Sequence, residues 1–488
     1  MKKDILSNYI NQGINIVARF ILIPILLIKL GTSAYGLIGF YFTIESTLVF
    51  LDFGIGSASA RFLADKTESN MVYKFSLIKK IEMIYIGLAT LASLSIFLLS
   101  SFLSKHWLTI DNPQLNGEKI VQLMSLLFLV SWPKSLYENF MSGQFLLYQK
   151  NIINSIFTIL RSVSLFILFY FFKGTLEHYF IILILFNFLE VIGLRIRAFK
   201  QSPAEISPID GMQIKYFLLS CAGIGVFSML SLVYFQLDKI YISKAMTSSE
   251  LAYYNLSFTL PLALLSLLYP ISSSLFPRLT NFKNDQYHST FFIKWFTLLL
   301  IVILTYLSTL YVYSYWILDL WLGQNNSSVN ITLLIYSCAG IFFYGCSLLF
   351  QNLYIANYKS NVLNKAFLFS SLFYILFILL TKPNLQQTAI AWTISSFIVF
   401  MSLMFEFYST YNSIASQLLF YAIKIISIFI LFIIIHRLYF QYNENNICIS
   451  LIGNVILSLL LIPLTFKVLP SFVQDDIKHF IQEKKSWL

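Results

Sequence analysis

The chain has 488 residues, of which 58% are hydrophobic, 17% aromatic and only 11% charged, and its formal net charge is +11. No soluble domain has so apolar a composition, so the sequence is that of an integral membrane protein. The positive net charge is explained by lysine and arginine on one side of the membrane and by their attraction to anionic lipid. It gives no reason to expect nucleic acid as a partner.

Apolar stretches about 20 residues long, the length that a membrane-spanning helix needs, recur along the whole chain. Barrel strands would be about half that length and would alternate polar with apolar residues. The first stretch follows Lys2 and Lys3, contains Arg19 and Pro24, and precedes no small-residue cleavage site, so we expect it to remain as a helix. The sequence predicts an all-α membrane protein with about fourteen transmembrane helices, at roughly residues 9–30, 36–59, 80–103, 120–146, 151–172, 178–197, 213–243, 250–275, 290–316, 331–356, 362–381, 386–410, 416–437 and 447–468.

Lysine and arginine gather in alternate loops of this arrangement, and they set its orientation because cytoplasmic loops are enriched in both residues. With the N-terminus inside, most of the 33 lysines and arginines fall in inward loops and tails. The inward loops near residues 61–80, 195–200 and 278–283 carry many of them. We therefore expect both termini to be cytoplasmic.

Cysteine and histidine give no sign of a metal or catalytic site. The four cysteines lie in or beside apolar stretches with no metal-ligand spacing, and the five histidines are scattered. The sequence also lacks a phosphate-binding glycine loop and the common hydrolase and zinc-protease motifs. We expect no metal, no cofactor and no soluble-type catalytic site.

Four weak sequence matches, in one order and about 210 to 215 residues apart, indicate an internal repeat. The period spans six helices, so both copies would enter the membrane in the same direction. We expect a six-helix lobe at 1–205, a second at 206–412 and two further helices with a cytoplasmic tail at 413–488, the two lobes surrounding a central cavity. The matching segments are TSAYGL from Thr32 and TSSELAYYNL from Thr247, SASARFL and SSSLFPRL, WLTIDN and WLGQNN, and YQKNIIN and YKSNVLN.

Polar side chains form stripes along several predicted helices of the first lobe. A charged group at the bilayer centre costs about 3 kcal/mol, so the stripes are expected to face inward, around water or a ligand. Residues three, four or seven apart share a helix face. By that spacing the stripes are Asn8, Gln12, Asn15 and Arg19 on the first helix; Glu45 and Asp52 on the second; Lys134 and Glu138 on the fourth; Asn151, Asn154, Thr158 and Arg161 on the fifth; and Asn187 and Glu190 on the sixth.

Two interpretations of these charges remain open, binding and scaffolding. As scaffolding, they would form buried ion pairs that hold the helices together. Against this, the repeat places Tyr234 at the position of Arg19 and Ser371 at that of Arg161, so the second lobe is built without those arginines. Pro24 is expected to bend the first helix just after Arg19. The pairs expected for scaffolding are Arg19 with Asp52, Arg161 with Glu190, and Lys134 with Glu138.

Three segments resemble the Wzx-type O-antigen flippases of the multidrug/oligosaccharidyl-lipid/polysaccharide exporter superfamily: ARFILIPILLIKLGTSAYGLIGF from Ala18, LDFGIGSASARFLADK from Leu51 and LDKIYISKAMTSSELAYYNL from Leu237. The resemblance implies a bacterial inner-membrane transporter, not an enzyme. Its substrate would be an undecaprenyl-pyrophosphate-linked O-antigen oligosaccharide, moved from the cytoplasmic to the periplasmic leaflet by alternating access. Members commonly have twelve helices, so twelve is the alternative to fourteen, with a two-helix extension known from the related lipid II flippases.

The resemblance and the chemistry of pyrophosphate together define a predicted site. Arginine offers phosphate a fixed charge with forked donors. Coupling to a proton or sodium gradient would need a carboxylate, and the expected partners are membrane lipids, an O-antigen polymerase and a chain-length regulator. The predicted substrate-binding residues are Arg19, Arg161, Lys134, Asn15, Gln12 and Asn154, and the predicted ion-coupling or charge-pairing residues are Asp52, Glu45, Glu190 and Glu138.

Two other functions fit parts of the sequence. A multidrug or cation exporter of the same superfamily would favour an acidic cavity, whereas this chain mixes acids with arginines. An O-antigen polymerase usually carries a long periplasmic loop, but the longest outward loop predicted here runs only from about Ser104 to Lys119. The flippase is therefore the preferred prediction.

Overall fold

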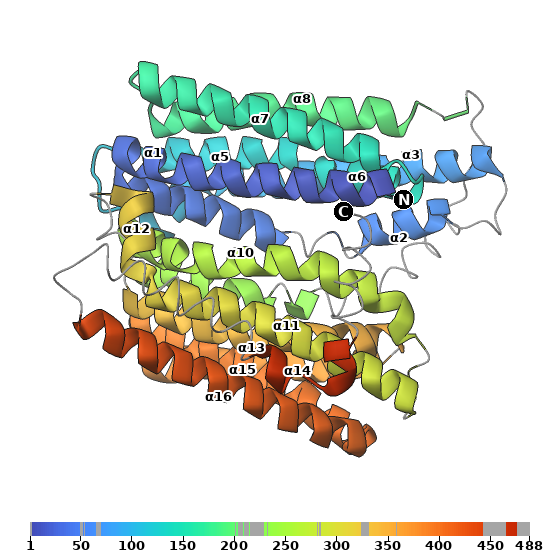
Figure 1. The fold of residues 1–488 in the computed structure, drawn as a ribbon. Coiled ribbons are helices and arrows are strands. Elements are labelled where there is room, and N and C mark those ends of the chain that lie inside the picture. Colours follow the sequence, from blue (N-terminus) through green and yellow to red (C-terminus); the bar gives the residue numbers. More distant parts are fainter. Residues whose placement is uncertain are drawn as a thin grey trace, which may run out of the picture. The chain divides into compact units, whose positions relative to one another are not determined.

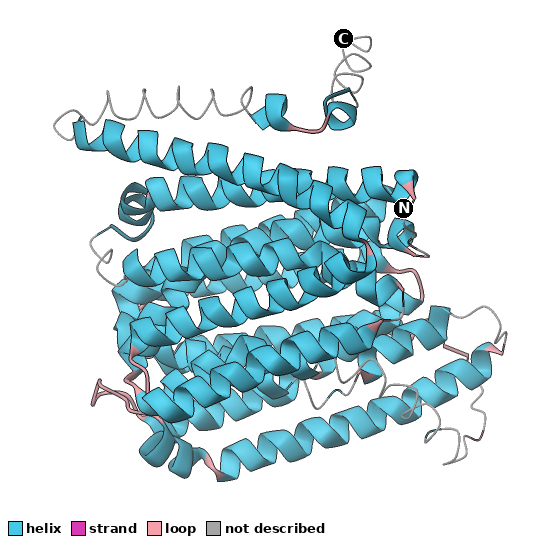
Figure 2. Cartoon of the chain, turned by 90° about the horizontal axis from the view of Figure 1, so that it is seen from below, coloured by secondary structure: helices cyan, strands magenta, loops and turns pink. Residues whose placement is uncertain are grey.

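A computed structural model describes residues 2–48, 52, 54–64, 70–200, 202–203, 208, 214, 229–231, 233–280, 282, 285–323, 331–357, 359–442 and 465–475. Over these ranges the chain is helical, as Figure 2 shows, with one isolated bridge between Thr109 and Thr247 and no strand. The predicted all-α fold is confirmed. Among the described residues, eleven helices are long and apolar enough to cross a membrane, so this is a multi-pass membrane protein.

Figure 1 shows the helices of the described residues in chain order by colour. The first half contains α1 (Lys2–Leu48), α2 (Ile55–Ala64), α3 (Met71–Leu98), α4 (Ser100–Phe102), a π-helical turn η2 (Leu103–Trp107), α5 (Gly117–Ser131), α6 (Pro133–Gly143), α7 (Leu147–Phe171) and α8 (Leu176–Ala198). The second half contains α10 (Ser248–Leu279), α11 (Gln286–Val312), α12 (Ser314–Leu322), α13 (Ile331–Ala356), α14 (Ser360–Thr381), α15 (Leu385–Thr410) and α16 (Asn412–Tyr442).

The predicted count of fourteen helices is not confirmed. The expected segment 213–243 lies in part, and the segment 447–468 almost wholly, outside the described residues. The first expected segment and most of the second lie on either side of a kink in α1, which consists of two helices joined at Gly31. Gly31 interrupts α1 with φ 81° and ψ 172°, values that only glycine adopts readily.

Helix ends differ from the prediction at two places. The second expected segment, 36–59, is interrupted at Gly54, whose φ is 78°, and a separate α2 begins at Ile55. The fourth expected segment is divided into α5 and α6 at Pro133, which occupies the first turn of α6. Proline fits a first turn because the missing N–H has no intrahelical partner there in any case.

The chain packs as two compact units. The first unit comprises Met1–Leu256 and Trp321–Ser328, and the second comprises Ser257–Leu320 and Val329–Leu488. In the first unit α1 packs on α7, α7 on α8, and α5 on both α3 and α8, while α2 packs on α6. In the second unit α13 is central and packs on α15 and α11, with α14 on α15 and α16 on α11. The lobes predicted at 1–205, 206–412 and 413–488 rest on the repeat and stay a prediction.

A polar seam inside the first unit joins α1 to the start of α10. Ser33 and Ser248, which the repeat aligns, have hydroxyl oxygens 2.7 Å apart, and Ser248 donates to Asp111 at 2.6 Å. Burial raises the pKa of Asp111, but hydrogen bonds from Ser248, Ser249 and Ser33 outweigh it, so its pKa lies below the ordinary value. The seam is tight because Gly36 has no side chain to meet the Ser248 carbonyl.

Candidate functional site

Five ionisable side chains of the first unit form a charged cluster: Glu45 of α1, Lys134 and Glu138 of α6, Arg161 of α7 and Glu190 of α8. Every one of these helices except the short α6 is itself a candidate membrane span, and α6 is the second part of the span Gly117–Gly143. Charges at this depth are costly and mark functional sites by default, so this cluster is the first place to look for chemistry.

Glu190 lies at the centre of the charged cluster. Its side chain has no exposed surface, and Lys134 Nζ is 2.6 Å from its Oε1. Arg161 Nη1 is 3.6 Å from Oε2, an oxygen that accepts no hydrogen bond from the part of the chain that is described. One carboxylate therefore balances two cations from two different helices.

Neutral side chains fix the orientation of the cluster. Arg161 Nη1 donates to Asn187 Oδ1, and Asn187 in turn donates to the Ser131 hydroxyl at 2.7 Å. Asn154 donates to Glu138 Oε1 at 2.6 Å, and Lys134 Nζ is 3.9 Å from the same oxygen. The pairs expected for Arg161 with Glu190 and for Lys134 with Glu138 are thus both present.

Glu45 has a different environment from the other two carboxylates of the cluster. Its Oε1 accepts a hydrogen bond from the Tyr41 hydroxyl at 3.0 Å, one turn earlier on α1. Three positive charges act on it, those of Lys134, Arg161 and Arg19, with Arg19 the weakest. No ion pair of Glu45 is found among the described residues. Glu45 is therefore held by a neutral group and faces cations at longer range.

The polar stripe of α1 packs on that of α7. Asn151 donates to Asn8 Oδ1 at 2.7 Å, and Thr158 donates to Asn15 Oδ1 at 3.3 Å. Gln12 is half-buried and makes no polar contact with any residue that the structure describes. These amides satisfy one another between two membrane helices and lead along α1 toward Arg19.

Arg19 is exposed on α1, and within the described ranges its guanidinium makes neither an ion pair nor a hydrogen bond. The expected pair with Asp52 is not found. Asp52 lies between α1 and α2, where its carboxylate accepts from the Gly56 N–H at 3.2 and 3.4 Å and caps α2. Asp52 and Glu45 do not share a helix, because α1 ends at Leu48. Their assignment, and that of the other residues, to substrate or ion binding stays a prediction.

Glu82, a second buried carboxylate, is not among the residues predicted for the site. Glu82 of α3 accepts from the Tyr137 hydroxyl at 2.5 Å and from Arg195 Nε at 2.6 Å. Its side chain is only 6% exposed, whereas that of Arg195 is 56% exposed. A carboxylate inside a predicted apolar segment is itself a signal, and it was available in the sequence.

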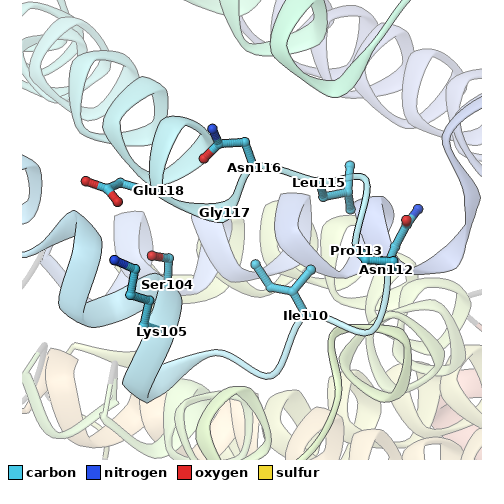
Figure 3. Close-up of a pocket in the computed structure, with 9 residues that line it drawn as sticks. All are labelled: Ser104, Lys105, Ile110, Asn112, Pro113, Leu115, Asn116, Gly117 and Glu118. Carbon is cyan, nitrogen blue, oxygen red and sulfur yellow. The ribbon is translucent and has the colours of Figure 1, made fainter.

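A pocket of about 300 Å³ lies elsewhere in the first unit, between η2 and the start of α5 (Figure 3). Its polar lining includes Lys105 and Glu118, both at the left of the close-up, and Asn112 of the connecting loop at the right. None of the residues predicted for the site lines this pocket. Over the described ranges, no three side chains of the metal-ligating types come together.

The first 283 residues, more than half of the chain, match the model of the family described as polysaccharide biosynthesis protein. The chain belongs to that family. No curated protein sequence matches this polysaccharide biosynthesis protein.

Solved structures show which fold the family member has. The lipid II flippase MurJ in an inward closed conformation is similar with a TM-score of 0.69 and 14% identity, over 95% of this chain and 98% of MurJ. An inward-facing multidrug resistance MATE transporter of the MOP superfamily is similar with a TM-score of 0.62 and 11% identity, over 83% of this chain and 96% of that transporter. A MATE transporter of Vibrio cholerae is similar with a TM-score of 0.57 and 15% identity, over 85% of this chain and 98% of that transporter.

These likenesses show that the polysaccharide biosynthesis protein has the fold of MOP-superfamily transporters. The prediction that the protein is not an enzyme is confirmed by the family, and the fold is one that transporters have. Transport by this protein stays a prediction. The narrower resemblance to Wzx-type O-antigen flippases, and with it the O-antigen substrate, stays a prediction.

Proposed function

We propose that this protein is a flippase that moves an undecaprenyl-pyrophosphate-linked O-antigen oligosaccharide from the cytoplasmic to the periplasmic leaflet by alternating access. The observation that carries the proposal is the charged cluster, with Arg19 exposed beside it on α1. The family supports a role in polysaccharide biosynthesis, and the likeness to a lipid II flippase supports a lipid-linked substrate.

The chemistry of the cluster fits both parts of such a substrate. Sugar hydroxyls that cross hydrocarbon without partners cost several kcal/mol each, so their path needs polar side chains such as Asn15 and Asn154. Pyrophosphate needs cations with several donors, which Arg19 and Arg161 supply. The polyprenyl tail needs no protein partner because it is soluble in lipid.

The ion pairs suggest an order of binding. Lys134 and Arg161 are already neutralised by Glu190, whereas no ion pair of Arg19 is found in the described chain. An incoming pyrophosphate therefore meets Arg19 first and then competes with Glu190 for the other two cations. The exchange replaces one oxyanion by another, so no cation is left buried without a partner.

Among the carboxylates predicted to couple an ion, Glu45 fits best. Glu190 is held by two cations, Glu138 by Lys134 and Asn154, and Asp52 by its cap of α2. Glu45 has a phenol as its nearest partner and can gain or lose a proton or sodium ion without breaking a short ion pair. The proposal places the protein in the inner membrane with both termini cytoplasmic, alongside a polymerase and chain-length regulator as partners.

The test is the sidedness of the lipid-linked oligosaccharide in cells that lack this protein. We expect the oligosaccharide to accumulate on the cytoplasmic leaflet in these cells. The wild-type protein should restore its delivery to the periplasmic leaflet fully, and the Arg19→Lys protein should restore it in part. Arg19→Ala is expected to lower delivery about ten- to hundredfold, the effect of losing one charge-assisted contact of about 1.5–3 kcal/mol. Lys29→Ala is the matched control, since Lys29 is exposed on the same helix and is outside the predicted site.

The second candidate, a multidrug or cation exporter, is favoured by the three carboxylates of the cluster and by the fold shared with MATE transporters. It predicts that cells lacking the protein become sensitive to cationic drugs while the oligosaccharide still reaches the periplasmic leaflet. That pair of results in cells that lack the protein would overturn the flippase proposal.

A further inference from the structure

Pro24 lies inside α1, and the structure supplies a donor for the carbonyl that this proline leaves without its helical partner. Proline has no N–H, so the carbonyl of Phe20, four residues earlier, cannot receive the usual helical hydrogen bond. Trp321 Nε1 donates to that Phe20 oxygen at 2.8 Å. The bend expected at Pro24 does not end the helix, and the backbone of α1 is non-helical only at Gly31.

The contact is a specific one. The rings of Trp321 and Phe20 stack with centroids 4.7 Å apart and planes inclined by 13°, and Trp321 is only 7% exposed. The two residues are 301 positions apart in the chain. An unsatisfied carbonyl is costly in a membrane, so the indole N–H stabilises α1 at a point where the helix cannot stabilise itself.

The contact also adjoins the predicted anion site. Phe20 follows Arg19 directly, and the Arg19 guanidinium has no partner among the described residues to fix its direction. The direction of Arg19 therefore depends on the backbone at residues 19 and 20. That backbone is held by Trp321, at the start of the short segment Trp321–Ser328 that belongs to the first unit, while the rest of α12 before it belongs to the second.

We propose that Trp321 is a positioning residue for the pyrophosphate site: its indole N–H replaces the hydrogen bond lost at Pro24 and so fixes the direction in which α1 presents Arg19. The proposal rests on the proposed function, because it assigns Trp321 a role only through Arg19. It predicts that Trp321 matters because Pro24 is a proline, and that an alanine at position 24 makes the indole donor unnecessary.

The experiment is a double-mutant cycle on the purified full-length protein in lipid nanodiscs, with undecaprenyl pyrophosphate as the probe. Trp321→Phe keeps a stacking ring and removes the donor, and we expect its Kd for the probe to rise about three- to tenfold. In a Pro24→Ala protein, the restored backbone N–H at position 24 bonds the Phe20 carbonyl, so adding Trp321→Phe is expected to change the Kd by less than about twofold. Trp107→Phe is the matched control: its Nε1 donates to Ser243 instead, at 3.1 Å.

The outcomes separate this inference from the function on which it rests. If Arg19→Ala leaves the Kd unchanged, the proposed function fails at its anion site. If Arg19→Ala weakens binding but Trp321→Phe does not, or if Trp321→Phe costs as much in the Pro24→Ala protein as in the wild type, the positioning role is overturned. If Trp321→Phe alone does not fold, the proposal requires Pro24→Ala to restore folding and binding, and a double variant that is equally unfolded overturns it.

Discussion

Glu190 shows at the scale of one residue how a buried carboxylate balances cations from two helices. Its two oxygens face Lys134 and Arg161, and none of its surface is exposed. Without this anion, two cations from two helices would be left without a balancing charge. In the proposed function, these are the cations that an oxyanion of the substrate would bind in place of the carboxylate.

We predict that Glu190→Gln lowers the free energy of unfolding by about 3–5 kcal/mol, because it keeps the shape of the side chain and leaves both cations uncompensated. Thermal unfolding of the purified protein in detergent measures the loss. Glu177→Gln is the control on the same helix, since Glu177 is also 2.6 Å from a lysine, Lys119, but is one-third exposed. Its loss should be at most about 1 kcal/mol. Equal losses for the two variants would show that burial does not govern the Glu190 pairing.

At the scale of an element, α1 approaches the start of α10 closely because Gly36 has no side chain at the contact. A Cβ added at Gly36 would lie 1.7 Å from the carbonyl oxygen of Ser248, and backbone cannot move aside as a flexible side chain does. Ser33, three residues earlier, makes its 2.7 Å contact with the hydroxyl of the same Ser248. The close approach of the two segments and their hydrogen bond therefore depend on one another.

We expect Gly36→Ala to destabilise the protein by about 1–3 kcal/mol, the usual cost of forcing an atom into a packed contact, and to weaken the Ser33–Ser248 seam. Gly13→Ala on the same helix is the control, because a Cβ there meets nothing within 4 Å and alanine favours helix by up to about 1 kcal/mol. Melting temperatures of the two variants in one detergent decide the matter. A Gly36→Ala protein as stable as Gly13→Ala would mean that the seam opens without cost.

Helix faces could be predicted from the sequence, but the angles between helices could not. The spacing of Asn151, Asn154 and Thr158 gives the face of α7 that is buried, because a period of 3.6 residues depends on one helix only. The 2.6 Å contact of Lys134 with Glu190 depends on how α6 and α8 are rotated against each other, which no spacing encodes. The sequence therefore predicts which residues point inward and leaves their partners open.

Asp52 and Trp321 show two further limits on what the sequence can predict. The apolar pattern continues to about residue 59 and so predicts Asp52 on one helix with Glu45, although Gly54 interrupts the backbone there. Trp321 bonds a carbonyl 301 residues away, and such a long-range contact leaves no local pattern. Only its acceptor was predictable, since Pro24 identifies Phe20 as the carbonyl that lacks a donor.

At the scale of the whole molecule, the distribution of lysine and arginine makes a prediction about orientation. Positive residues retard transfer of a loop across the membrane, so the loops rich in them stay inside. The linker around Lys200 and the C-terminal tail are then cytoplasmic, and the loop at residues 108–116 is periplasmic. This orientation also places the start of α1, with its polar stripe leading toward Arg19, on the side where the proposed substrate is made.

Reporter fusions test this orientation directly. Alkaline phosphatase inserted after Pro113 should be active, because the loop is predicted to face the periplasm. Green fluorescent protein inserted at the same place should not fluoresce. The same reporters at the C-terminus should give the opposite result, inactive phosphatase and bright fluorescence, with equal amounts of protein as the control. The reverse pattern at both sites would show that the chain has the opposite orientation in the membrane. The stripe from Asn8 to Arg19 would then open toward the periplasm, and transport toward that side could no longer begin with Arg19.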